Sequence, residues 1–152
     1  MLSIFGYWII NILCNSELFY MRAYLIDTDN PTNTGIIDLF GDSVTDKGKS
    51  PLPTYYELLK CRCIDIVTRK IGDKWLDIIC NDEGLYTDHP HVSVLDLKGR
   101  SMIYGNVIIT NSTKDGYQCT LSDEDVQQIE DNLVWIVDED ILRPVLWRVR
   151  YD

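Results

Sequence analysis

Two pairs of residues have side chains that can bind a metal ion. Cys61 and Cys63 are separated by one residue, and so are His89 and His91. Alternate residues of a strand share a face, so the two thiols can lie together. Zinc sites, however, favour two to four residues between cysteines and three to five between histidines. We therefore expect no metal site. The alternative reading is two strand thiols in the core and two histidines in a surface loop.

Acid–base or nucleophilic catalysis is not indicated either. Asp82 and Glu83 are adjacent, but they sit in an Asn-Asp-Glu-Gly sequence typical of a solvated turn, whereas a catalytic carboxyl group usually needs burial. Cys80 and Cys119 have no evident neighbouring base. The chain contains no Gly-x-Ser-x-Gly, Walker, dinucleotide-binding or His-Glu-x-x-His motif. We expect a protein without enzymatic activity and without a cofactor.

The C-terminal third contains a run of acidic residues. Eight Asp or Glu residues fall between Ser122 and Asp140, with no Lys or Arg among them. Such a run usually forms a solvated surface, but it can also imitate a phosphate backbone and occupy a basic groove of another protein. Nearby aromatic side chains can anchor an interface. The predicted partner-binding residues are Glu124, Asp125, Asp131, Trp135, Asp138, Glu139 and Asp140.

Composition limits the class of protein. A chain of 152 residues with 45% hydrophobic residues can bury one sizeable core. The formal net charge of −10 repels nucleic acid and anionic membranes, so neither is an expected partner. Five cysteines, an odd number, and no convincing secretory leader favour a reducing compartment. We expect the protein to work in the cytoplasm of a host cell.

The first twenty residues are doubtful. The apolar run from Leu2 to Cys14 is too short for a confident membrane span, which needs about 20 apolar residues. Three interpretations stay open: a short buried helix, a membrane-associating segment, or a start placed too early. We expect the natural start at Met21, with 1–20 an extension and 21–152 a single domain.

Periodicity and turn residues predict an α+β fold. Strands are expected at 22–27, 35–40, 102–110 and 145–151, and a hairpin is expected from 61–71 and 75–80 around Gly72-Asp73. A short helix is expected at 55–60, capped by Thr54. A second helix should begin after Ser122, with Val126, Ile129 and Leu133 facing inward.

Two details complete this prediction. Gly105 should mark a bulge or a close backbone approach within the 102–110 strand. The elements should form one small, mostly antiparallel sheet of about four to six strands, with one or two helices packed on one face.

Three of these segments together resemble a known family. The hairpin ends in IICNDEGL (78–85), a later strand reads IYGNVIIT (103–110), and the helix reads LSDEDVQQI (121–129). In this order they are similar to the family called domain of unknown function 3846. The resemblance implies a bacterial, phage or mobile-element setting and no particular reaction.

Two functions follow as expectations. The first is a non-enzymatic accessory protein of a phage or mobile element, an anti-defence factor that binds and inhibits a host protein through its acidic surface. The alternative is a homo-oligomeric protein that sequesters a small nucleotide-type signalling molecule. Its ligand would be held by cationic and amide side chains. The predicted ligand-binding residues are Arg69, Lys70, Lys74, Asn81 and Asn106.

Overall fold

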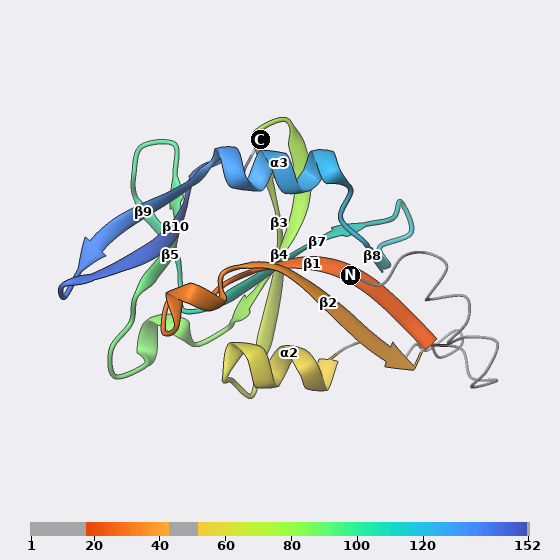
Figure 1. Cartoon of the computed structure of the whole chain (residues 1–152), viewed down its shortest axis with the longest axis horizontal. Coiled ribbons are helices and arrows are strands. Elements are labelled where there is room, and N and C mark those ends of the chain that lie inside the picture. The colour runs from red at the N-terminus through yellow and green to blue at the C-terminus, as the bar shows by residue number, and fades with distance from the viewer. Residues whose placement is uncertain (1–17, 43–51, 152) are drawn as a thin grey trace.

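The computed structural model describes residues 18–42 and 52–151 (Figure 1). The expectations for 1–17 therefore lie outside the described residues. Leu18–Tyr20 continue the first strand ahead of Met21 and pair with Phe40–Asp42. Within the described residues, no helix has the length and apolar character needed to cross a bilayer.

The larger of two sheets is antiparallel throughout. Its strand order is β2-β1-β7-β4-β3, and the short β8 also pairs with β7. The strands are β1 (Leu18–Ile26), β2 (Gly35–Asp42), β3 (Ile64–Ile71), β4 (Lys74–Asn81), β7 (Val107–Ser112) and β8 (Gln118–Cys119). A 3-10 helix, η1 (Pro31–Asn33), lies between β1 and β2. The hairpin predicted around Gly72-Asp73 is confirmed as the β3–β4 pair.

The smaller sheet has the strand order β6-β5-β10-β9. Its strands are β5 (Val92–Asp96), β6 (Ser101–Tyr104), β9 (Leu133–Asp138) and β10 (Ile141–Val149). The β10–β5 pair is parallel and the other pairs are antiparallel. A second 3-10 helix, η2 (Gly84–Tyr86), precedes this sheet. The α+β class and the mostly antiparallel pairing are confirmed, but the expectation of a single sheet was wrong.

The second sheet arises because the strand predicted at 102–110 is interrupted at Gly105. A single strand was expected over 102–110, but β6 ends at Tyr104 and β7 begins at Val107 in the other sheet. Gly105 has a φ of 88°, a left-handed conformation that side-chain-bearing residues rarely adopt. The glycine therefore redirects the chain from one sheet to the other, which is a larger change than a bulge.

The two helices cover opposite faces of the larger sheet, not one face as expected (Figure 1). Helix α2 (Leu52–Leu59) buries Tyr55 and Leu59 in a core that includes Ile79 and Ile108. Helix α3 (Asp123–Asp131) buries Val126 and Ile129 in the other core, which includes Ile78 and Ile109. Successive strand residues point to opposite faces, so β4 and β7 supply both cores.

The helix starts were predicted with different success. Ser122 does cap α3: its hydroxyl accepts from the Asp125 amide at 3.0 Å, and the Asp125 carboxylate accepts from the Ser122 amide at 2.9 Å. Thr54 does not cap α2, which begins earlier, at Leu52. Pro53 fits this first turn, since a proline there forfeits no helical hydrogen bond. Leu133 lies in β9, just beyond the end of α3.

The last strand contains an irregularity that sequence alternation missed. Strict alternation along the strand predicted at 145–151 would place Val145, Trp147, Val149 and Tyr151 on one face. Arg148 has a φ of 59°, and the register of β10 on β5 shifts between Leu146 and Val149. Leu146 and Val149 consequently both reach the core beneath α3, while Trp147 is exposed.

A chain begun at Met21 should remain folded. The described residues that it loses, Leu18–Tyr20, contribute backbone pairing at the far end of β1, whereas Met21 and Ala23 are fully buried. We expect the free energy of unfolding to fall by less than about 2 kcal/mol, or a few degrees in Tm, measured by thermal melting beside the full chain. A chain begun at Tyr24 is the control and should not fold. Loss of folding in the Met21 chain would place residues 1–20 in the core.

Candidate functional site

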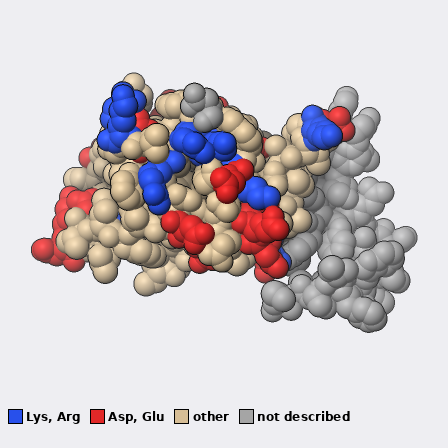
Figure 2. Space-filling model, turned by 90° about the horizontal axis from the view of Figure 1, so that it is seen from above, with Lys and Arg blue, Asp and Glu red and all other residues tan. Residues whose placement is uncertain are grey.

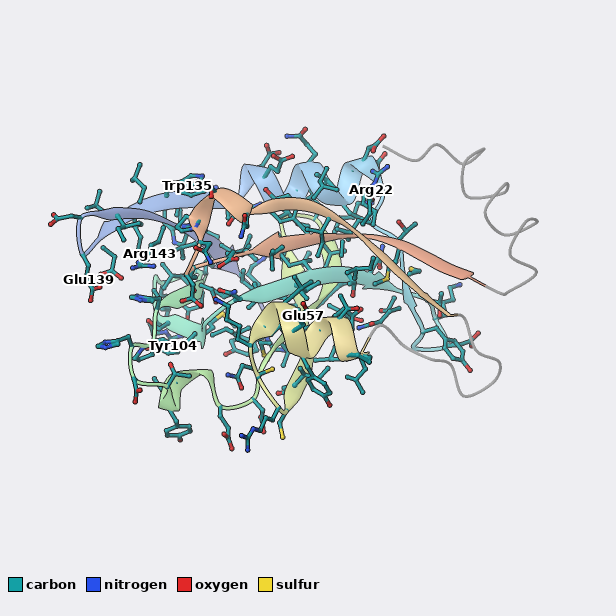
Figure 3. All side chains as sticks on the ribbon, turned by 60° about the horizontal axis from the view of Figure 1, so that its bottom comes forward. Arg22, Glu57, Tyr104, Trp135, Glu139 and Arg143 are labelled. Atoms are coloured by element: carbon teal, nitrogen blue, oxygen red, sulfur yellow. The ribbon has the colours of Figure 1, made fainter. Side chains whose placement is uncertain are left out.

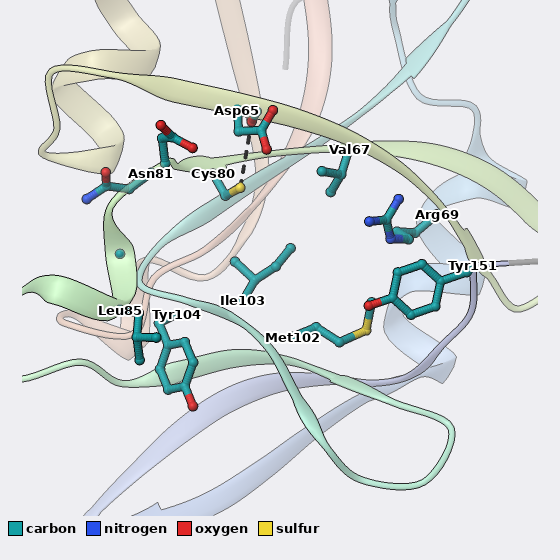
Figure 4. Close-up of a pocket in the computed structure, with 12 residues that line it drawn as sticks. Asp65, Val67, Arg69, Cys80, Asn81, Leu85, Met102, Ile103, Tyr104 and Tyr151 are labelled. Carbon is teal, nitrogen blue, oxygen red and sulfur yellow. Dashed lines mark hydrogen bonds between the residues drawn. The ribbon is translucent and has the colours of Figure 1, made fainter.

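Two of the three segments that resemble the family, 78–85 and 103–110, help to line a cavity between the two sheets. This motif cavity has a volume of about 230 Å³ and opens between the β3–β4 hairpin and β6 (Figure 4). The hairpin side is lined by Asp65, Val67, Arg69, Cys80, Asn81, Asp82, Gly84 and Leu85, and the other side by Met102, Ile103, Tyr104 and Tyr151.

Close packing of one turn on β6 shapes the cavity. The side-chain oxygen of Asn81 accepts from the Glu83 amide at 2.9 Å, which closes the Asn-Asp-Glu-Gly turn. A Cβ at Gly84 would overlap the carbonyl oxygen of Tyr104, a backbone atom that cannot easily give way. Gly84 therefore lets the two family segments approach each other, and its role is one of space.

The motif cavity is lined by side chains of both charges (Figure 4). At one end the guanidinium of Arg69 lies 4.4 Å from the centre of the Tyr151 ring, a cation–π contact. The carboxylate of Asp65 lies away from this contact, near Cys80, and Asp82 also lines the cavity. Apolar side chains lie between the charged groups, so a ligand with a flat body and an anionic group would find contacts for both.

The guanidinium of Arg69 keeps hydrogen-bonding capacity. One Nη donates to the Thr68 carbonyl at 2.8 Å, and Nε has no hydrogen-bond partner among the described residues. Arginine has five N–H donors in a planar fork that suits carboxylate and phosphate groups. Arg69 is therefore the residue of this cavity best suited to hold an oxyanion.

Three of the described cysteines, Cys61, Cys80 and Cys119, are not suited to nucleophilic chemistry. Burial, followed by the nearby carboxylates of Asp65 and Asp82, raises the pKa of Cys80 to about 11. Burial also raises the pKa of Cys61 and that of Cys119. A raised pKa leaves the thiol protonated at neutral pH, and the thiolate is the reactive form.

Two of the five predicted ligand residues line the motif cavity, and the others have different positions. Arg69 and Asn81 line the motif cavity, as the ligand-binding alternative requires. Lys70 instead pairs its backbone with Arg150, and Lys74 forms an ion pair with Glu124 at 3.2 Å. Neither lysine lines the motif cavity. Tyr104 and Tyr151, which do, were missed because residues that meet across two sheets leave no local pattern.

Asn106 is buried, and three of the four hydrogen bonds that its side chain can make are formed within the protein. Its oxygen accepts from the Thr28 amide at 2.9 Å and from the Thr28 hydroxyl at 3.1 Å. Its nitrogen donates to the Leu58 carbonyl at 3.2 Å. The prediction that Asn106 binds a ligand is not supported by this geometry, because the side chain joins β1, α2 and the β6–β7 link.

A second cavity, of about 190 Å³, lies on the other side of the Asn81–Gly84 turn and includes both histidines and Lys60. His91 Nδ1 lies 3.1 Å from the Asp138 carboxylate.

Cys61 packs against the core beneath α2, and Cys63 is exposed. Over residues 18–42 and 52–151, no three His, Cys, Asp or Glu side chains are grouped to hold a metal ion.

The predicted acidic residues on α3 differ in exposure: Glu124 and Asp131 are exposed, whereas Asp125 is buried. Asp125 is only 2% exposed, and its carboxylate accepts from Ser122 and from Asn111, so its assignment to an outward surface was wrong. Glu124 pairs with Lys74, and Asp123 pairs with Arg22 at 2.6 Å. Asp131 accepts from the side chain of Gln127 at 2.8 Å.

The remaining predicted acids lie at the tip of the β9–β10 hairpin, well apart from the start of α3 where Arg22 lies (Figure 3). Asp138 lies 3.5 Å from Nε of the buried Arg143 and also contacts His91, and Glu139 lies 4.0 Å from Arg143. Glu139 and Asp140 form the turn itself, both with positive φ. Figure 2 accordingly shows acidic side chains in separate patches with basic and uncharged atoms between them.

Comparison with known proteins identifies a family. A family model described as domain of unknown function (DUF3846) matches residues 21–134. This match covers more than half of the chain, so the chain belongs to that family, and the resemblance seen in the three segments is confirmed. No curated protein and no solved structure matches the chain.

The two asparagines of the predicted ligand set should differ in their effect on stability. Asn106→Ala leaves the Thr28 amide and the Leu58 carbonyl without partners, and an unpaired buried group costs about 1–3 kcal/mol. We expect the free energy of unfolding in denaturant to fall by about 2–4 kcal/mol. Asn81→Ala is the matched control and should cost less than about 1 kcal/mol. Equal losses would contradict these roles.

Alkylation should separate the buried thiol from the exposed one. With a pKa of about 11, Cys80 is about 0.1% thiolate at pH 8, and it is also buried. Iodoacetamide followed by peptide mass spectrometry should modify Cys63 rapidly and leave Cys80 unmodified. Unfolding in denaturant should expose both equally. Modification of native Cys80 as fast as Cys63 would show a reactive site that the burial argument excludes.

Proposed function

We propose that this member of the DUF3846 family is a small-ligand-binding protein whose motif cavity holds a nucleotide-type molecule. The observation that carries the proposal is the contact of Arg69 with the Tyr151 ring, at one end of a cavity that the family segments 78–85 and 103–110 help to line. Binding and sequestration need no chemical step, in keeping with the expectation of a non-enzymatic accessory protein. The site of action we propose is the cytoplasm of a host cell.

Each part of a nucleotide has a counterpart in the cavity. A phosphate oxygen accepts hydrogen bonds from the guanidinium of Arg69. The base packs on the ring of Tyr104 and on Ile103, since every base offers a flat face for stacking. Sugar hydroxyl or base amino groups donate to Asp65 or Asp82.

Volume limits the size of the ligand. At about 230 Å³ the motif cavity is smaller than the roughly 300–1,000 Å³ of typical sites for drug-sized ligands. We therefore propose a nucleoside monophosphate or a similar single-nucleotide unit. The net charge of −10 opposes an anionic ligand at long range, which makes the local contact with Arg69 decisive.

The placement of the acids favours this reading over the inhibition of a host protein by an acidic surface. That function would need the predicted acids side by side and free. Asp125 is instead part of a helix cap, and Glu124 and Asp138 have cationic partners. The hairpin acids are separated from those of α3 (Figure 3).

Replacing Arg69 should weaken the binding of phosphate-bearing ligands selectively. Arg69→Met keeps much of the apolar stem and removes the charged hydrogen-bond donors, which contribute about 1.5–3 kcal/mol. Isothermal titration with a panel of nucleoside monophosphates should show an affinity lower by about 10- to 100-fold. Affinity for the matching nucleoside, which lacks the phosphate, should be nearly unchanged.

Lys74→Met is the matched control, because it removes one positive charge from a residue that does not line the cavity. It should leave the affinity for every ligand unchanged. If no member of the panel binds the parent, or if both variants reduce nucleoside and nucleotide affinity alike, the proposed function is wrong.

A further inference from the structure

The outer edge of β9 differs from the other sheet edges. Its sequence is Leu-Val-Trp-Ile-Val-Asp, and within the described residues only β10 pairs with it. Proteins usually protect an edge strand with Lys, Pro, a bulge or a short length, because unpaired backbone groups invite another strand. β9 has none of these protections over its first five residues.

The other edges of the two sheets are protected. β3 carries Asp65, Arg69 and Lys70, and part of its edge is covered where Lys70 pairs with Arg150. β2 carries the exposed Asp38, and β6 is only four residues long. An apolar, unprotected edge is therefore a specific property of β9.

Apolar side chains surround this edge. Val137 is 72% exposed, Leu142 opposite it on β10 is 56% exposed, and Trp135 is 47% exposed. Residues that face each other across strands share a face of the sheet, so these three side chains lie together. Ile136 and Ile141 are exposed on the other face. The hairpin thus exposes apolar surface on both faces next to an open edge.

We propose that β9 pairs antiparallel with β9 of a second copy of this chain, so that two small sheets join into one. This inference is independent of the ligand proposed for the motif cavity. Strand addition of this kind satisfies the open backbone groups of both copies at once and buries the side chains beside the edge.

The sequence of β9 favours a second copy as its partner. A two-fold axis perpendicular to the sheet keeps each residue on its own face, so it must place a residue opposite its own copy. With Trp135 opposite Trp135 of the second copy, Val134 lies opposite Ile136 and Leu133 lies opposite Val137. Apolar residues meet apolar residues at every central position, which is the self-complementarity that a two-fold interface requires.

Charge decides the direction of pairing. Asp138, Glu139 and Asp140 lie together at one end of β9. A parallel arrangement would bring the two acidic tips side by side, which is unfavourable for chains that each carry a net charge of −10. The antiparallel arrangement places the tips at opposite ends of the joint sheet and leaves only apolar residues at its centre.

The interface should be a modest one. A standard stable interface buries about 800 Å² on each partner, whereas here one six-residue strand and a few neighbouring side chains take part. We therefore expect a dimer with a Kd of about 1–100 µM, populated at high concentration and dissociated by dilution.

Sedimentation of the full chain over about 1–300 µM should show the 17.6 kDa monomer giving way to a species of twice that mass. Val137→Lys places a charge at the edge without opening the core and should raise the Kd at least about tenfold. Leu97→Lys is the matched control: it makes the same kind of change at an exposed residue beyond β5 and should leave the Kd unchanged.

Two further measurements keep the test independent of misfolding. Ile136→Thr keeps a β-branched residue in the strand and should also weaken the dimer, while melting curves show whether each variant is folded. Amide hydrogen exchange at 134–137 should slow as concentration rises. A chain that stays monomeric throughout would overturn the proposal, as would a dimer that Val137→Lys leaves intact or that protects other amides instead.

Discussion

The fold depends on the hydrogen bonds that the buried side chain of Asn106 makes. This residue lies where the chain leaves the small sheet and enters the large one, directly after the left-handed Gly105. Its three hydrogen bonds join that crossing to the end of β1 and to the last turn of α2. The carbonyl of the same Thr28 accepts from the guanidinium of Arg143 on β10, only 5% exposed. Thr28 and Asn106 together therefore hold the two sheets at the relative position that leaves the motif cavity between β3 and β6.

The family match includes most of the motif cavity and ends before the tip of the β9–β10 hairpin. The family match ends at Val134, so it includes all the residues that line the motif cavity except Tyr151. The exposed part of the β9–β10 hairpin lies beyond it. The ligand site and the strand interface that we propose therefore lie in different parts of the chain. The net charge would oppose the proposed anionic ligand, whereas the acidic hairpin tips would favour the proposed antiparallel pairing.

Features that depend on neighbours in sequence were predictable from sequence alone. The hairpin around Gly72 and the cap at Ser122 rest on turn and capping chemistry within a few residues. Features that depend on distant residues were not. The roles of Asn106 and Asp125 follow from partners at Thr28, Leu58 and Asn111, and the use of both sheet faces follows from a strand order that no local pattern encodes. For the same reason the sequence pointed to Arg69 as a ligand residue but not to Tyr151 beneath it.

The order of strands in the large sheet has a consequence for how the chain folds during synthesis. The β1–β2 and β3–β4 hairpins join neighbouring segments and can form as soon as each pair of strands has been made. They do not pair with each other, because β7 lies between β1 and β4 and pairs with both. The large sheet therefore cannot be completed until Val107–Ser112 has left the ribosome. Insertion of β7 between the two hairpins brings together residues far apart in sequence, a slow kind of step.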